Sequence, residues 1–117
     1  MNDYKDLRVW QDSIDLVVNI YKLTKMFPQE ELYALTNQIR RAVVSIPSNI
    51  SEGANRNTDK EFVQFLYIAL GSASEVETQL IIAKRLGYID DVDTELDNIT
   101  KLRKMINALI HSIKTSN

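Results

Sequence analysis

Apolar residues recur along the chain in steps of three and four over four long stretches, which is the spacing of one face of an α-helix. No stretch of useful length shows the strict alternation that is typical of a β-strand. The four stretches cover residues 7–26, 29–55, 58–87 and 91–114, with short connections between them. Because short connections favour neighbouring helices that run in opposite directions, the pattern predicts one all-α domain over residues 1–117, an antiparallel up-and-down four-helix bundle.

The first stretch has more apolar residues than one helix face requires. The stripe predicted to face the core is Trp10, Ile14, Val17, Tyr21 and Thr24. The residues that extend this arc outward are Val9, Leu16, Ile20, Leu23 and Phe27. Since a monomeric bundle needs one apolar stripe for each helix, this excess predicts contact with another molecule.

The second stretch contains Pro47 in the middle of a helical pattern. Pro47 has no N–H to donate to the carbonyl of Val43, so either one helix kinks there or two helices meet. The apolar stripe keeps its phase from Ile46 to Ile50, which favours a kink in one helix. The predicted core stripe is Leu35, Ile39, Ala42, Ile46, Ile50 and Gly53.

The third stretch has signals at both ends. Thr58 and Glu61 match a capping box, in which the Thr hydroxyl accepts a hydrogen bond from the Glu61 N–H, and Gly87 suits a left-handed residue after the helix. The heptad seam between these ends is Phe62, Leu66, Ala69, Ala73, Val76, Leu80, Ala83 and Gly87. The fourth stretch has acidic residues near its start and basic ones near its end, as the helix dipole favours. Its apolar face is Val92, Leu96, Ile99, Leu102, Ile106, Leu109, Ile110 and Ile113.

The composition argues against several chemistries. There is no Cys, which excludes disulfides and cysteine nucleophiles, and the one histidine, His111, falls on the polar side of the fourth stretch. Neither a Glu-x-x-His pair nor a Gly-rich phosphate loop occurs. We therefore expect no enzyme activity, no cofactor, no metal and no small-molecule substrate. No secretory signal or membrane-spanning apolar run is visible, so a cytoplasmic protein with no membrane partner is expected.

A flank of polar residues runs beside the core stripe of the second stretch. Its members are Gln38, Arg41, Ser45, Ser48, Asn49, Glu52 and Arg56, and the third stretch offers Ser72, Glu75 and Gln79 as partners. Polar groups are costly to half-bury unless they are paired. One interpretation is a structural network of Gln38, Ser45, Asn49, Glu52, Ser72 and Glu75; the other is a ligand or RNA site. The structural interpretation is favoured, because satisfied polar networks commonly specify a fold.

The third stretch also carries a line of residues on its outer side. These residues are Tyr67, Gly71, Ser74, Thr78 and Ile82. Two large residues flank three small ones, a surface that another helix can approach closely, and Tyr33 and Val44 add apolar surface on the second stretch. Aligned exposed apolar residues usually mark an interface, so we predict that this line is the contact surface of a closed homo-oligomer.

The chain resembles the four-helix-bundle family named after proteins encoded within intervening sequences of bacterial 23S ribosomal RNA genes. The segments that carry the resemblance are residues 7–10, Phe27-Pro28 with Glu31, residues 38–53, Phe62, Phe65-Leu66, Ala69, Gly71-Ser72, Glu75, Glu77 and residues 86–88. The resemblance implies ring-shaped pentamers. It also implies kinship with the accessory protein of diversity-generating retroelements, a strongly basic protein that works with a reverse transcriptase and nucleic acid. This chain has a net charge of −2 and no basic arm, so the resemblance carries nucleic-acid binding over only weakly.

Two hypotheses for function follow. The first is a non-enzymatic, self-associating bundle that touches RNA through Arg40, Arg41 and Arg56. The alternative is a protein-interaction scaffold or accessory subunit, for a polymerase or another partner, that binds no nucleic acid directly.

Overall fold

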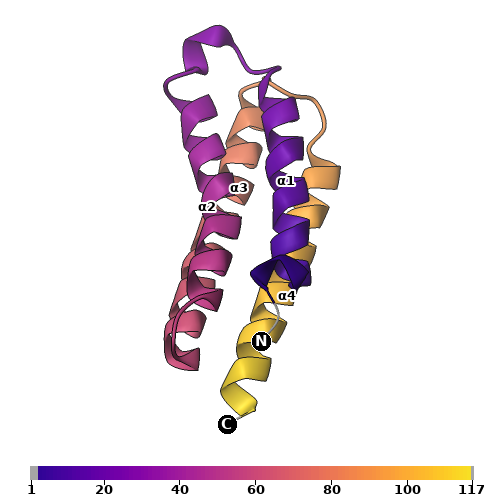
Figure 1. The fold of residues 1–117 in the computed structure, drawn as a ribbon. Coiled ribbons are helices and arrows are strands. Elements are labelled where there is room, and N and C mark those ends of the chain that lie inside the picture. Colours follow the sequence, from indigo (N-terminus) through magenta and orange to yellow (C-terminus); the bar gives the residue numbers. More distant parts are fainter. Residues whose placement is uncertain (1–2, 117) are drawn as a thin grey trace.

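The computed structural model describes residues 3–116, and within them the regular elements are all helical. The four long helices are α1 (Arg8–Thr24), α2 (Leu35–Ala54), α3 (Asp59–Arg85) and α4 (Asp93–Thr115). Two 3-10 turns precede α1 and α2: η1 (Tyr4–Asp6) and η2 (Gln29–Glu31). The chain reverses direction at each connection (Figure 1), so the predicted all-α, up-and-down four-helix arrangement is confirmed.

The helices pack as a ring in chain order, with α1 also lying against α4. The pairing of α2 with α3 is the most extensive, and that of α1 with α4 the least. Gly53 shows how closely α2 and α3 approach, because a Cβ at this position would lie 2.7 Å from the Cβ of Phe65. Only glycine fits there without moving one of the two helices apart.

The core is one continuous cluster with members from all four helices. Most residues of the predicted stripes of α2, α3 and α4 lie in it, with Ile39, Leu66 and Ile99 among its fully buried members. The half-buried stripe residues that pack against it are Leu35, Leu96, Leu109 and Ile113. The ends of the α3 seam differ from the middle, since Phe62 is half-buried and Gly87 is exposed.

The predicted orientation of the first helix is wrong, with the exception of Thr24. The buried residues of α1 are Val9, Ser13, Leu16, Ile20 and Thr24, whereas Trp10, Ile14 and Val17 are half-buried and Tyr21 is exposed. The pattern misled because two polar residues lie on the core face. Their hydroxyls donate to carbonyls of α1 itself, from Ser13 to Trp10 at 2.7 Å and from Thr24 to Ile20 at 2.8 Å. A hydroxyl satisfied inside its own helix can be buried at little cost.

The second helix starts later than expected but crosses its proline without a break. A 3-10 turn and an irregular Ala34 replace the first part of the predicted helix, and α2 begins at Leu35, whose N–H donates to the Glu31 carboxylate at 3.3 Å. Pro47 is buried inside a continuous α2, so the alternative of two helices meeting is wrong. The kink itself stays a prediction.

Both predicted end signals of α3 are confirmed. The Glu61 N–H donates to the Thr58 hydroxyl at 3.2 Å, and this hydroxyl donates to the Glu61 carboxylate at 3.0 Å. At the other end Gly87 has φ of 81°. The Gly87 N–H bonds the Lys84 carbonyl and the Tyr88 N–H bonds the Ala83 carbonyl, which is the pair of bonds of a Schellman motif.

Candidate functional site

The polar flank of α2 meets α3 at an open hollow of about 390 Å³. Its lining is Asn37, Gln38, Arg41, Ala42, Ser45, Ser72 and Glu75. Four of the six residues predicted for the structural network therefore lie together. Asn37 was missed, although it lies one helical turn before Arg41 and so shares its side of the helix.

The floor of this polar hollow is hydrogen-bonded within the chain. The Ser45 hydroxyl accepts a bond from the Ser72 hydroxyl at 2.9 Å and another from the Asn49 amide at 2.8 Å. The same Asn49 amide donates to the Ser45 carbonyl at 2.8 Å. Ser72 is only 7% exposed, so its bond to Ser45 satisfies a hydroxyl that water scarcely reaches. The Ser72–Ser45 bond joins α3 to α2, and the two Asn49 bonds hold the Ser45 side of it within α2.

Two charged side chains at the rim of the polar hollow have no partner among the described residues. The side chains of Arg41 and Glu75 are both exposed and line the same space, yet across residues 3–116 neither side chain forms a hydrogen bond or an ion pair. Gln79, one helical turn after Glu75 on α3, is 8% exposed, and its Oε1 has no hydrogen-bond partner in the described part of the chain. The rim therefore presents one free cation and one free anion to solvent.

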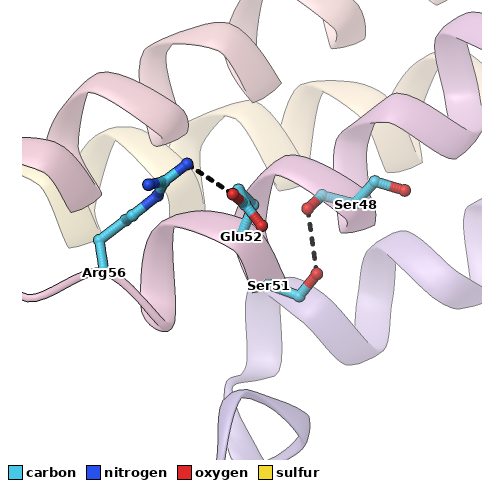
Figure 2. Close-up of polar contacts among 4 residues, drawn as sticks. All are labelled: Ser48, Ser51, Glu52 and Arg56. Atoms are coloured by element: carbon cyan, nitrogen blue, oxygen red, sulfur yellow. Dashed lines mark hydrogen bonds and ion pairs between the residues drawn. The ribbon is translucent and has the colours of Figure 1, made fainter.

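Glu52 does not belong to this network. It accepts a hydrogen bond from Arg56 at 2.6 Å (Figure 2), and the two side chains are 53% and 43% exposed. The Arg56 guanidinium lies 5.0 Å from the centre of the Phe65 ring. The expectation of a half-buried Glu52 is wrong, because α3 presents an aromatic ring at this end of the seam and not a polar partner.

Arg40 is also held within the chain. Its Nε donates to the Thr24 hydroxyl at 2.9 Å, and its guanidinium lies 4.8 Å from the centre of the Tyr21 ring. Of the three arginines predicted to contact RNA, Arg40 and Arg56 are engaged by side chains of the protein, and Arg41 is free among the described residues.

A second hollow, of about 280 Å³, lies on the other side of α2, between α2 and α1. Its lining is Tyr4, Trp10, Ile14, Val17, Val44, Pro47, Ser48 and Ser51. Trp10, Ile14 and Val17 are the residues that the sequence pattern had assigned to the core. We call this space the apolar groove, because no lining residue carries a charge.

The outer line of α3 is exposed along its whole length. Tyr67 is 50% exposed and Ile82 42%, and Gly71, Ser74 and Thr78 between them are exposed as well. A Cβ at Gly71 would meet no atom within 4 Å. The Tyr67 hydroxyl accepts a bond from Lys114 of α4 at 3.3 Å, which fixes one end of this line.

Sequence reasoning missed one contact at the end of the bundle. The Tyr88 hydroxyl donates to the Glu31 carboxylate at 2.5 Å, and the rings of Tyr88 and Phe27 are 5.8 Å apart. The hydrogen bond to Glu31 raises the pKa of the Tyr88 phenol above its ordinary value, and desolvation and the nearby carboxylates add to the rise. The contact ties the segment after α3 to the segment before α2. Residues 57 positions apart in sequence give no local signal for it.

No group of three or more His, Asp or Glu in residues 3–116 is placed to hold a metal ion. None of the helices described is both long enough and apolar enough to cross a membrane. His111, the one histidine, is exposed on α4.

Fold and surface together define a four-helix bundle with a hydrogen-bonded polar seam on one side of α2 and an apolar groove on the other. Residues 5–108 match the family model of the 23S rRNA-intervening sequence protein, and the chain belongs to this family. It is similar to the crystal structure of a protein of unknown function from the S23 ribosomal protein family of Bacteroides thetaiotaomicron VPI-5482. The two chains are 28% identical with a TM-score of 0.81, over 87% of this chain and 97% of the other. No curated protein matches the chain.

Proposed function

We propose that this protein is a non-enzymatic helical bundle that works by self-association, with the outer line of α3 as its contact surface. The observation that carries the proposal is the exposure of Tyr67 and Ile82 around the small residues Gly71, Ser74 and Thr78. Single exposed apolar residues are normal, but their alignment along one helix usually marks an interface. The family resemblance adds the expectation of a ring of five subunits.

The test is a matched pair of arginine substitutions read by light scattering at micromolar concentration. Gly71→Arg places a long charged side chain in the contact, and because Gly71 is exposed and uncrowded the bundle still folds. Ala108→Arg makes a small-to-arginine change on the exposed side of α4. We expect wild type and Ala108→Arg to be oligomers and Gly71→Arg to be a monomer.

Two results oppose this proposal in different ways. A monomeric wild-type protein removes self-association. An oligomeric Gly71→Arg protein keeps self-association and removes α3 as its surface.

RNA contact at the polar hollow is the second candidate function, and the free guanidinium of Arg41 favours it. The test is a salt titration with fragments of 23S ribosomal RNA. We expect Arg41→Gln to weaken binding and to lower the slope of log K against log salt by about 1, as loss of one phosphate contact does. Arg56→Gln, which removes an arginine already paired with Glu52, should have a smaller effect. Absence of binding at low salt removes this candidate and leaves the scaffold alternative.

A further inference from the structure

We propose that the polar hollow between α2 and α3 binds a small zwitterion, a free α-amino acid with a polar side chain. Arg41 binds the carboxylate of this ligand, and Glu75 binds its ammonium group. The inference does not depend on self-association, and it gives the hollow a different ligand from the RNA considered above. The amino acid is a ligand and not a substrate, so the proposal of a non-enzymatic protein is unchanged.

Two side chains of opposite charge line this hollow without pairing with each other. Arg41 extends from α2 and Glu75 from α3, and both are exposed. Among residues 3–116 neither side chain has a hydrogen bond or an ion pair. The hollow of about 390 Å³ leaves room for a small molecule between them. A ligand with two opposite charges would satisfy both side chains at once.

The chemistry of the two groups identifies the charges of the ligand. The planar guanidinium of Arg41 matches a carboxylate by two parallel N–H···O bonds. The ionised carboxylate of Glu75 only accepts hydrogen bonds, so it suits the three N–H donors of an ammonium group. A simple anion would leave Glu75 unpaired and be repelled by it, and a simple cation would meet the same obstacle at Arg41. An α-amino acid carries both groups on one carbon.

The rest of the lining favours a polar side chain on the ligand. Asn37 and Gln38 lie one helical turn before Arg41, both are exposed, and their side-chain amides form no hydrogen bond among the described residues. Each amide offers both donors and an acceptor, so the pair can bind another amide. The other lining residues are the small Ala42, Ser45 and Ser72. An apolar side chain would therefore find little surface to cover, and an amide side chain such as that of glutamine fits best.

A second hollow, between α1 and α4, has charges of both signs but in a different balance. Asp12, Asp15 and Lys101 line it, which gives two anions and one cation. Asp12 is already paired with Arg8 at 3.8 Å. A lysine is also a point charge and lacks the planar fork that binds a carboxylate through two bonds. The lining of the polar hollow has one arginine and one glutamate, so its net charge is zero, as is that of the proposed ligand.

The test is a titration of the protein with small ligands at millimolar concentration, followed by ligand-observed NMR. L-glutamine is the probe, and L-leucine, which is of similar size, is the control for its side chain. Acetate and methylammonium each carry one of the two charges. We expect L-glutamine to bind, L-leucine to bind several-fold more weakly, and the two single-charge ligands to bind at least about tenfold more weakly.

Two substitutions with matched controls locate the site. Arg41→Gln and Glu75→Gln each remove one charge at an exposed helical position, and each should raise the dissociation constant of L-glutamine at least about tenfold. Arg56→Gln and Glu52→Gln make the same two changes at an exposed pair outside the lining, and both should bind L-glutamine like wild type.

Binding of RNA fragments separates the two ligands considered for this hollow. Phosphate contact through Arg41 predicts that Arg41→Gln weakens RNA binding. Glu75→Gln should strengthen RNA binding, because it removes a negative charge beside the phosphate. A zwitterion site instead predicts that both substitutions weaken the binding of L-glutamine.

Each other outcome has a definite meaning. If L-glutamine does not bind the wild-type protein at millimolar concentration, the inference is overturned. Binding that both substitutions in the hollow leave unchanged places the ligand elsewhere and overturns the site. If Arg41→Gln alone weakens binding, the hollow is an anion site, so the inference fails while the RNA candidate stands. Light scattering reads self-association separately, so a monomeric wild-type protein would remove the proposed function and leave this inference standing.

Discussion

Helix α2 lies between two surfaces of opposite character. On its α3 side, Ser45, Asn49 and Ser72 satisfy one another by hydrogen bonds inside a single copy of the chain. On its α1 side, Trp10 and Val44 leave apolar surface open to solvent. A hydrogen-bonded seam stabilises the bundle within a single copy of the chain. An open apolar surface contributes to stability only when another surface covers it and excludes water. We therefore expect substitutions on the first side to change the stability of the bundle and substitutions on the second to change its assembly.

The largest effect is expected where α2 and α3 approach most closely. Gly53→Ala places a Cβ 2.7 Å from the Cβ of Phe65, so the helices must separate, and we expect the free energy of unfolding to fall by about 2 kcal/mol. Gly71→Ala is the matched control at an open helical position, where alanine stabilises by about 0.5–1 kcal/mol. Urea unfolding measures both variants. Equal effects at the two glycines would contradict the close approach.

The next largest effect is expected in the polar seam. Ser45→Ala removes the acceptor of the buried Ser72 hydroxyl, and an unpaired buried hydroxyl costs about 1–3 kcal/mol. Ser72→Ala should cost less, because the Ser45 hydroxyl keeps its bond from Asn49. The double variant should lose less than the sum of the two, and light scattering below the unfolding transition should show unchanged assembly. Additive losses would mean that Ser45 and Ser72 act independently.

The sequence predicts the positions of the four helices well, but it predicts the buried face of α1 incorrectly. Apolar periodicity identifies a helix face most clearly when all polar residues avoid the core, as on α4, where every buried residue is apolar. On α1, Ser13 and Thr24 satisfy their hydroxyls within the helix, so they are buried on the face that the pattern had turned outward. The pairing of Ser45 with Ser72 could be expected from the antiparallel arrangement. The apolar groove could not, because it depends on the true orientation of α1.

A third effect is expected at the end of the bundle, away from both surfaces of α2. The pKa of Tyr88 is raised above 10.0 in the folded protein, so the neutral phenol is the favoured form there. The hydrogen bond from the Tyr88 phenol to Glu31 contributes fully to the stability of the folded protein below about pH 10. This contribution is lost as the pH rises through the raised pKa of Tyr88.

Tyr88→Phe should therefore lower the Tm at pH 7, and the difference from wild type should shrink as the pH rises above 10. Thermal unfolding followed by circular dichroism between pH 7 and pH 11 measures this. Tyr33→Phe, at a tyrosine that is 91% exposed, should follow wild type throughout. Phenylalanine keeps the ring that packs on Phe27, so an unchanged Tm of Tyr88→Phe at pH 7 would mean that the bond to Glu31 adds nothing to stability.

The smallest effect is expected on the outer side of α2, at the end of the polar seam. The Glu52–Arg56 pair is exposed and spaced four residues apart, and such pairs contribute about 0.3–0.5 kcal/mol. Glu52→Ala should therefore reduce stability by no more than that, and 1 M salt should remove most of the difference. Asn49→Ala, one turn earlier and half-buried, should cost more and resist salt, because it removes two bonds to Ser45. If Glu52→Ala proved as costly as Asn49→Ala, the polar network would extend to Glu52, and Glu52 and Arg56 would not be an independent exposed pair.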